Sequence, residues 1–139
     1  MLKKTITYNL PDLDDPGKSL EVTEEFYFNL TQAEAIEINI VEDLERVYAS
    51  QNPRRILQTF KRIIQASYGE RQGMKIVKNE DSAGAFLASE AYSKLAEEIL
   101  FTPGAEQKMA DFVRAILPTD WDAQKAKLNQ PQLPAEGEN

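Results

Sequence analysis

The chain has 139 residues, of which 42% are hydrophobic, and it carries a formal net charge of −7. The acidic balance argues against nucleic acid as a partner, because phosphate binding needs clustered lysine and arginine, and no apolar run approaches the length of a membrane span. The sequence has neither histidine nor cysteine, so the commonest general base, transition-metal ligands and thiol nucleophile are missing, and we expect no catalytic residue, no metal site and no cofactor.

Two strands are predicted at the start of the chain, and they form an antiparallel hairpin over residues 3–29. Residues 3–10, KKTITYNL, alternate apolar and polar side chains with the period of a half-buried strand, and residues 20–29 do the same. Its predicted inner face is apolar and holds Ile6, Tyr8, Phe26 and Phe28. Tyr27 points to the outer face. The N-terminal residues contain no apolar signal segment, which favours a cytosolic protein.

The loop between these strands, residues 11–19, contains fragments of two ligand-binding motifs. The letters GKS at 17–19 match the end of a phosphate-binding loop, but Asp12 stands at the first glycine position and a strand follows instead of a helix. The loop also has part of the spacing of a calcium site, but Pro16 replaces an oxygen ligand and Thr23 replaces the bidentate glutamate. We therefore interpret it as a solvated hairpin loop.

A helix is predicted over residues 32–49, where apolar side chains recur every three or four positions. Thr31 and Glu34 have the spacing of a capping box, which places the start of the helix. Its buried stripe is expected to hold Ala33, Ile36, Ile40, Leu44 and Val47.

Further helices are expected over residues 53–68, 82–88, 90–100 and 103–116. Asn52-Pro53 and Thr102-Pro103 each provide a cap followed by proline at the first helical position. Asp81 and Ser82 are the expected caps of the 82–88 helix, and Ser89 or Glu90 opens the next one.

The 53–68 helix is expected to end at Gly69 in a left-handed conformation, and residues 70–80 to form a turn at Gly73 with a short extended piece. The elements together predict a single globular domain over residues 1–118. Its class is α+β and mostly helical: an N-terminal antiparallel β-hairpin packed on a bundle of four to five short α-helices. Residues 119–139, rich in glutamine, asparagine and proline, are predicted to be a flexible C-terminal tail.

A few side chains are candidates for contact with a protein partner. A basic cluster on the 53–68 helix could bind an acidic partner, or it could pair with the acidic 32–49 helix or be solvated. Trp121, the single tryptophan, either folds back on the body or anchors a partner. The candidate contacts are Tyr27, Arg54, Arg55, Arg62 and Trp121. The carboxylates at positions 42–45 are interpreted as a solvated helix face, since no apolar pocket around them is implied.

Several segments, in this order and spacing, resemble the tail assembly chaperones of long-tailed phages and prophages, particularly those of Gram-positive hosts. These segments are LKKTITY, TEEFYFNLTQAEAIEI, FKRIIQASYG, KIVKNED leading into SEAYSKLAEEIL, and FVRAILP. They cover about residues 2–118. The chain departs from the family pattern in a longer hairpin loop and in an extended tail after Pro118.

The resemblance implies a non-enzymatic protein that coats the helical tape-measure protein in the cytoplasm of the host bacterium, helps recruit tail-tube subunits and leaves before the virion is finished. The 32–49 and 53–68 helices could supply an apolar groove for this partner. Self-association is left open. If the gene continues through a ribosomal frameshift, as in many phages, the segment from Thr119 lies near the junction. Alternatives are a structural head–tail connector or tail-completion subunit, and a small enzyme that acts through carboxylates.

Overall fold

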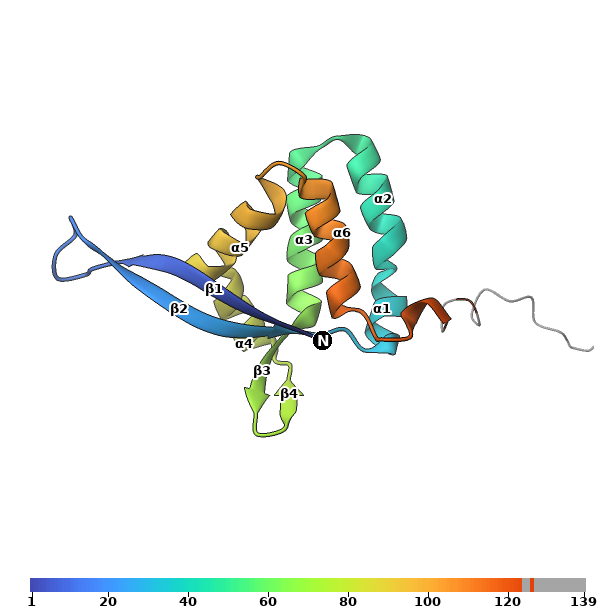
Figure 1. The fold of residues 1–139 in the computed structure, drawn as a ribbon, viewed down its shortest axis with the longest axis horizontal. Coiled ribbons are helices and arrows are strands. Elements are labelled where there is room, and N and C mark those ends of the chain that lie inside the picture. Colours follow the sequence, from blue (N-terminus) through green and yellow to red (C-terminus); the bar gives the residue numbers. More distant parts are fainter. Residues whose placement is uncertain (124–125, 127–139) are drawn as a thin grey trace, which may run out of the picture.

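The computed structural model describes residues 1–123 and 126, and it confirms a mostly helical α+β fold. The strands are β1 (Leu2–Pro11), β2 (Ser19–Phe28), β3 (Tyr68–Gln72) and β4 (Lys75–Val77). The helices are α1 (Gln32–Ile38), α2 (Ile40–Ser50), α3 (Pro53–Ser67), α4 (Glu80–Leu87), α5 (Glu90–Leu100) and α6 (Ala105–Ile116). The helices gather into one body, and the β1–β2 hairpin extends from it (Figure 1).

The four strands form one antiparallel sheet in the order β1-β2-β3-β4. The β1–β2 register runs from the pair Leu2–Phe28 to the pair Pro11–Ser19, so the predicted hairpin is confirmed. Its inner face is buried near the body, where Phe28 has no exposed surface, while Phe26 is half-buried. Figure 1 shows that the far half of the hairpin reaches beyond the helices.

The helix predicted over residues 32–49 is in fact two helices, because Asn39 interrupts it. Asn39 adopts a left-handed conformation with φ of 54°, and its N–H donates to the Ala35 carbonyl at 3.2 Å to close α1. Asparagine tolerates this region better than most residues. The break separates the apolar faces of α1 and α2. Ala33 and Ile36, both predicted to be buried, are exposed, Ile36 by 44%, and Ala35 is buried instead.

The caps of α1 and α3 follow the sequence prediction, whereas that of α4 differs. The Asn52 side chain accepts hydrogen bonds from two backbone amides ahead of it, and Pro53 opens α3. At α4 the cap is Asn79 instead of Asp81 or Ser82, and its Oδ1 accepts from the backbone N–H groups of both.

The predicted start of the last helix at Pro103 is also wrong, because α6 begins at Ala105. The Thr102 hydroxyl donates back to the Glu98 carbonyl at 2.6 Å, so it closes α5 instead of opening α6. Gly104, with φ of 78°, then makes the turn into α6, in a conformation that glycine adopts without strain.

The end of α3 differs from the prediction as well. Tyr68 closes the helix with φ of −64°, and Gly69 continues directly into β3 instead of adopting a left-handed conformation. Its lack of a side chain has another role: a Cβ on Gly69 would lie 2.2 Å from Cγ2 of Ile76 on the neighbouring strand β4. The predicted turn at Gly73 is confirmed and joins β3 to β4.

Gly69→Ala is therefore expected to lower the free energy of unfolding by about 1–3 kcal/mol, since the stiff Ile76 side chain must move. Gly84→Ala in α4 is the matched control, because a Cβ there meets no atom within 4 Å. It should raise stability by about 0.5–1 kcal/mol by favouring the helix. Urea unfolding followed by circular dichroism measures both, and equal effects of the two substitutions would contradict this account.

A short corner after β2 ties the sheet to two helix ends. The Asn29 N–H donates to the Ser67 carbonyl at 2.8 Å at the end of α3, and the Leu30 N–H donates to the Ile116 carbonyl at 2.9 Å at the end of α6. Leu30 itself is buried in the core. The next residue, Thr31, begins α1, so three helix termini meet within this corner.

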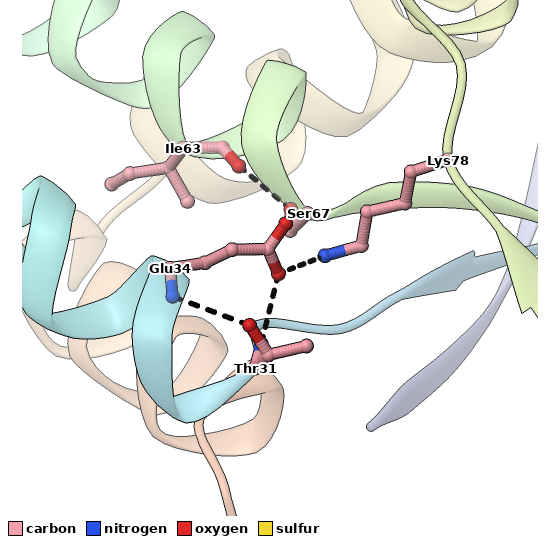
Figure 2. Close-up of polar contacts among 5 residues, drawn as sticks. All are labelled: Thr31, Glu34, Ile63, Ser67 and Lys78. Carbon is pink, nitrogen blue, oxygen red and sulfur yellow. Dashed lines mark hydrogen bonds and ion pairs between the residues drawn. The ribbon is translucent and has the colours of Figure 1, made fainter.

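The predicted capping box of α1 is confirmed, and it extends to a residue far along the chain (Figure 2). The Thr31 N–H donates to Glu34 Oε1 at 2.9 Å, and the Glu34 N–H donates to the Thr31 hydroxyl at 3.2 Å. Lys78 donates to the same Glu34 carboxylate and holds the β4–α4 connection against α1. Burial raises the pKa of Glu34, but the bonds from Lys78 and Thr31 and the charge of Lys78 outweigh it, so the pKa lies below its ordinary value of 4.5.

Glu34→Gln keeps a side chain that can complete the capping box but removes the ion pair, so we expect a loss of about 0.5–1 kcal/mol at neutral pH. Because the folded pKa is below the unfolded one, this stabilisation is complete above about pH 5 and is lost as the pH falls through the folded value. The variant should therefore lose less stability than the wild type between about pH 5 and pH 3. Urea unfolding across this pH range tests the difference, with exposed Glu37→Gln on the same helix as control.

Candidate functional site: a groove between α2 and α6

Two helices from distant parts of the chain turn matching faces toward one groove. From α2 the lining residues are Val41, Leu44, Glu45, Tyr48 and Ala49. From α6 they are Glu106, Met109, Ala110, Val113, Arg114 and Ala115, and the first five of these repeat the spacing of the α2 residues. Residues at positions i, i+3, i+4, i+7 and i+8 share one side of a helix, so each helix contributes a continuous stripe to the groove.

The chain that follows α6 closes one end of the groove. Leu117, Pro118 and Trp121 line this end, together with the N-terminal Met1. The groove has a volume of about 970 Å³. Trp121 is half-buried and packs against the hydrophobic core, so of the two alternatives for this residue the structure shows the folded-back position. The groove therefore brings together both termini of the described globular body.

The floor of the groove is apolar, and two of the side chains on its rim are small. Leu44, Met109 and Val113 are buried beneath it, and their carbon atoms form its base. The rim carries the exposed alanines Ala49 and Ala110, one on each helix. Small side chains at the rim let another backbone approach the apolar floor closely. This shape suits an elongated apolar ligand such as one face of a helix.

Unpaired polar atoms mark the same surface. In the described part of the chain, Tyr48 Oη, Tyr92 Oη and Trp121 Nε1 are buried without a hydrogen-bond partner. Two of these, on Tyr48 and Trp121, belong to residues that line the groove. Burial raises the pKa of Tyr48, and the negative charge of Glu106 raises it further. Buried donors without partners are uncommon in protein interiors.

Charged side chains stand on the rim and away from the floor. Glu45 on α2 and Glu106 on α6 are exposed acids. Arg114 and Asp122, also exposed, add one charge of each sign toward the closed end. The rim is thus mainly acidic over an apolar base. Such a distribution favours a ligand with an apolar stripe bordered by lysine or arginine.

The structure separates the other candidate contacts from this groove. Tyr27 is half-buried in the sheet, where it pairs with Lys3 on one side and Gly69 on the other. Arg54 and Arg55 are exposed in the first turn of α3.

Internal pairing, one of the alternatives for the basic cluster, holds for Arg62 alone among the described residues. Arg62 Nη2 lies 3.6 Å from Asp43 Oδ2 on α2, and Arg46 lies 3.5 Å from the other oxygen of the same carboxylate. Both arginines are exposed, so these contacts are weak.

The sequence predicted a helix over residues 103–116 but did not connect it to a groove. The groove-lining residues of α2 and α6 have the same spacing along the sequence, but nothing in the sequence shows that these two helices face each other. A groove was expected between the helices predicted over residues 32–49 and 53–68. The structure has a groove with α2, from the first of these segments, as one wall, but its other wall is α6 instead of α3.

Among the described residues, no three acidic side chains gather where they could hold a metal ion. No helix in this part of the chain has the length and apolar character to cross a membrane. An acidic α+β body with an open apolar groove is typical of a protein that binds other proteins.

Comparison with protein families agrees with this class. Residues 1–138 match the model of a family described as phage tail assembly chaperone. The chain therefore belongs to the phage tail assembly chaperone family, as its sequence resemblance indicated. Comparison with curated proteins and with solved structures gave no significant match.

Proposed function

We propose that this chaperone binds an apolar helical stretch of the tape-measure protein in the groove between α2 and α6. The observation that carries the proposal is the pair of matching apolar stripes, which line an open groove instead of packing on each other. A long helical protein exposes such stretches until the tail tube encloses it. Covering them removes apolar area from water at roughly 25 cal/mol per Å².

The rim charges define the partner segment further. Glu45 and Glu106 favour a helix that carries lysine or arginine beside its apolar stripe. The chain acts by binding and release in the cytoplasm of the bacterial host, and it performs no catalysis. Recruitment of tail-tube subunits then uses surfaces outside the groove, which stay accessible while the groove is filled.

Co-expression tests this function directly. The chain is produced with the tape-measure protein, and the soluble yield and co-elution of the latter are measured. We expect both to rise with the chaperone present, and addition of tail-tube protein should yield a three-component complex. An unchanged yield without co-elution would contradict the proposal. Detection of the chain in purified virions would instead favour a connector or tail-completion subunit.

Ala110→Lys tests the groove itself, since a long charged side chain on its rim blocks close approach of an apolar helix. Binding of tape-measure peptides should weaken at least tenfold, or about 1.4 kcal/mol. Trp121 provides the signal, because it is the single tryptophan and lines the groove. Peptides without tryptophan should shift its fluorescence when they bind.

Ala33→Lys is the matched control, because Ala33 is an exposed helical alanine on α1 outside the groove. It should bind the peptides as the wild type does. Thermal unfolding of both variants verifies that the fold is kept. Equal peptide binding by the wild type and Ala110→Lys would show that the binding site lies outside the groove.

A further inference from the structure

The short segment that follows α6, residues 117–122, turns back to the groove. Pro118 cannot continue the helix, and Leu117 before it is extended, with ψ of 157°. The chain then makes a turn in which the Trp121 N–H donates to the Pro118 carbonyl at 3.0 Å. This turn brings the indole of Trp121 to the closed end of the groove, which Leu117 and Pro118 also line.

The indole covers apolar surface that a ligand of the groove would need. Trp121 has the largest side chain among the groove-lining residues, and it packs against the hydrophobic core. The stripe of α6 that forms one wall runs from Glu106 to Ala115, and Leu117 follows it directly. A partner helix that covers this floor to its end therefore needs the area that the indole occupies.

The indole lacks the hydrogen bond that a buried tryptophan usually makes. Its Nε1 is buried and has no partner among the described residues. Water satisfies this donor as soon as the ring moves out of the groove, and this gain offsets part of the apolar contact that is lost. The position of Trp121 at the end of the groove is therefore one that a ligand can take over.

We propose that residues 117–122 are an internal competitor of the partner: Trp121 covers the closed end of the groove, and a partner helix binds by displacing its indole. The proposal rests on the function proposed above, because it concerns the same groove. Four residues separate Trp121 from the last residue of α6. Such a short link keeps the effective concentration of the ring at the groove on the order of millimolar.

Competition of this kind lowers the apparent affinity in proportion to the fraction of molecules whose groove is open. An indole that covers the groove in about nine-tenths of the molecules weakens partner binding about tenfold. The ring also returns to the floor when the partner helix lifts. It therefore favours the release step, which a chaperone that acts by binding and release needs.

The fluorescence of Trp121 tests the displacement in the unmodified chain, because this is the single tryptophan. Titration with a tape-measure peptide that lacks tryptophan should move the emission to longer wavelength and raise quenching by acrylamide at least twofold, since the displaced ring enters water. A partner that packed on an indole in its present position would cause the opposite shift and reduce quenching. That result, or an unchanged spectrum with the peptide bound, would overturn the proposal.

Two substitutions at the same position test the competition. Trp121→Ala removes the competitor, whereas Trp121→Phe keeps an aromatic ring. With a fluorescein-labelled tape-measure peptide, fluorescence anisotropy should show at least threefold tighter binding by Trp121→Ala than by the wild type, and binding close to wild type by Trp121→Phe. Phe101→Ala is the matched control, because it removes an exposed aromatic ring outside the groove, and it should bind as the wild type does.

A double variant shows whether the gained affinity belongs to the groove. Trp121→Ala combined with Ala110→Lys should lose the gain, because the lysine blocks the rim that the partner helix approaches. A gain that survives in the double variant would overturn the proposal. Thermal unfolding verifies that each variant is folded, and the emission of the wild type provides a test that needs no variant.

Failure of the competitor and failure of the groove function give different results. Equal or weaker binding by Trp121→Ala, with the wild type still binding the peptide, would overturn the competitor and leave the groove function intact. Absence of binding by both the wild type and Trp121→Ala would contradict the groove function, and the competitor with it. Binding by Trp121→Ala alone would support a competitor that keeps the groove almost fully covered.

Discussion

Two adjacent backbone hydrogen bonds after β2 fix the position of the sheet relative to the helices. The amides of Asn29 and Leu30 donate to the last carbonyls of α3 and α6, which are otherwise without helical partners. The same corner starts α1 through Thr31 and places Phe28 and Leu30 in the core. One short segment therefore fixes the sheet against three helix ends, and any movement of it would displace both walls of the groove.

The groove follows from how this corner and the left-handed Asn39 direct the helices. After Asn39, α2 packs mainly on α3, while α6 packs mainly on α5. The facing stripes of α2 and α6 are consequently left with little contact between them, and the small side chains of Ala49 and Ala110 leave the space open. The apolar floor is thus a consequence of which neighbours the helices have.

Features that depend on neighbouring residues could be predicted from the sequence. The hairpin followed from alternation, and the caps at Thr31 and Asn52 followed from side-chain chemistry, since both act within three residues. Asn39 escaped prediction because the apolar spacing continues across it. Gly69 was misplaced because its role is to admit Ile76 from another strand. The groove was only half predicted, since the sequence does not show which helix faces α2.

The distribution of charge carries more information than its sum. The overall acidity argued against nucleic acid as a partner. The net charge does not show, however, that the cations of α3 stand on one face, far from the acidic end of the β1–β2 hairpin at residues 9–21. Opposite charges kept apart within one molecule gain little from each other through solvent.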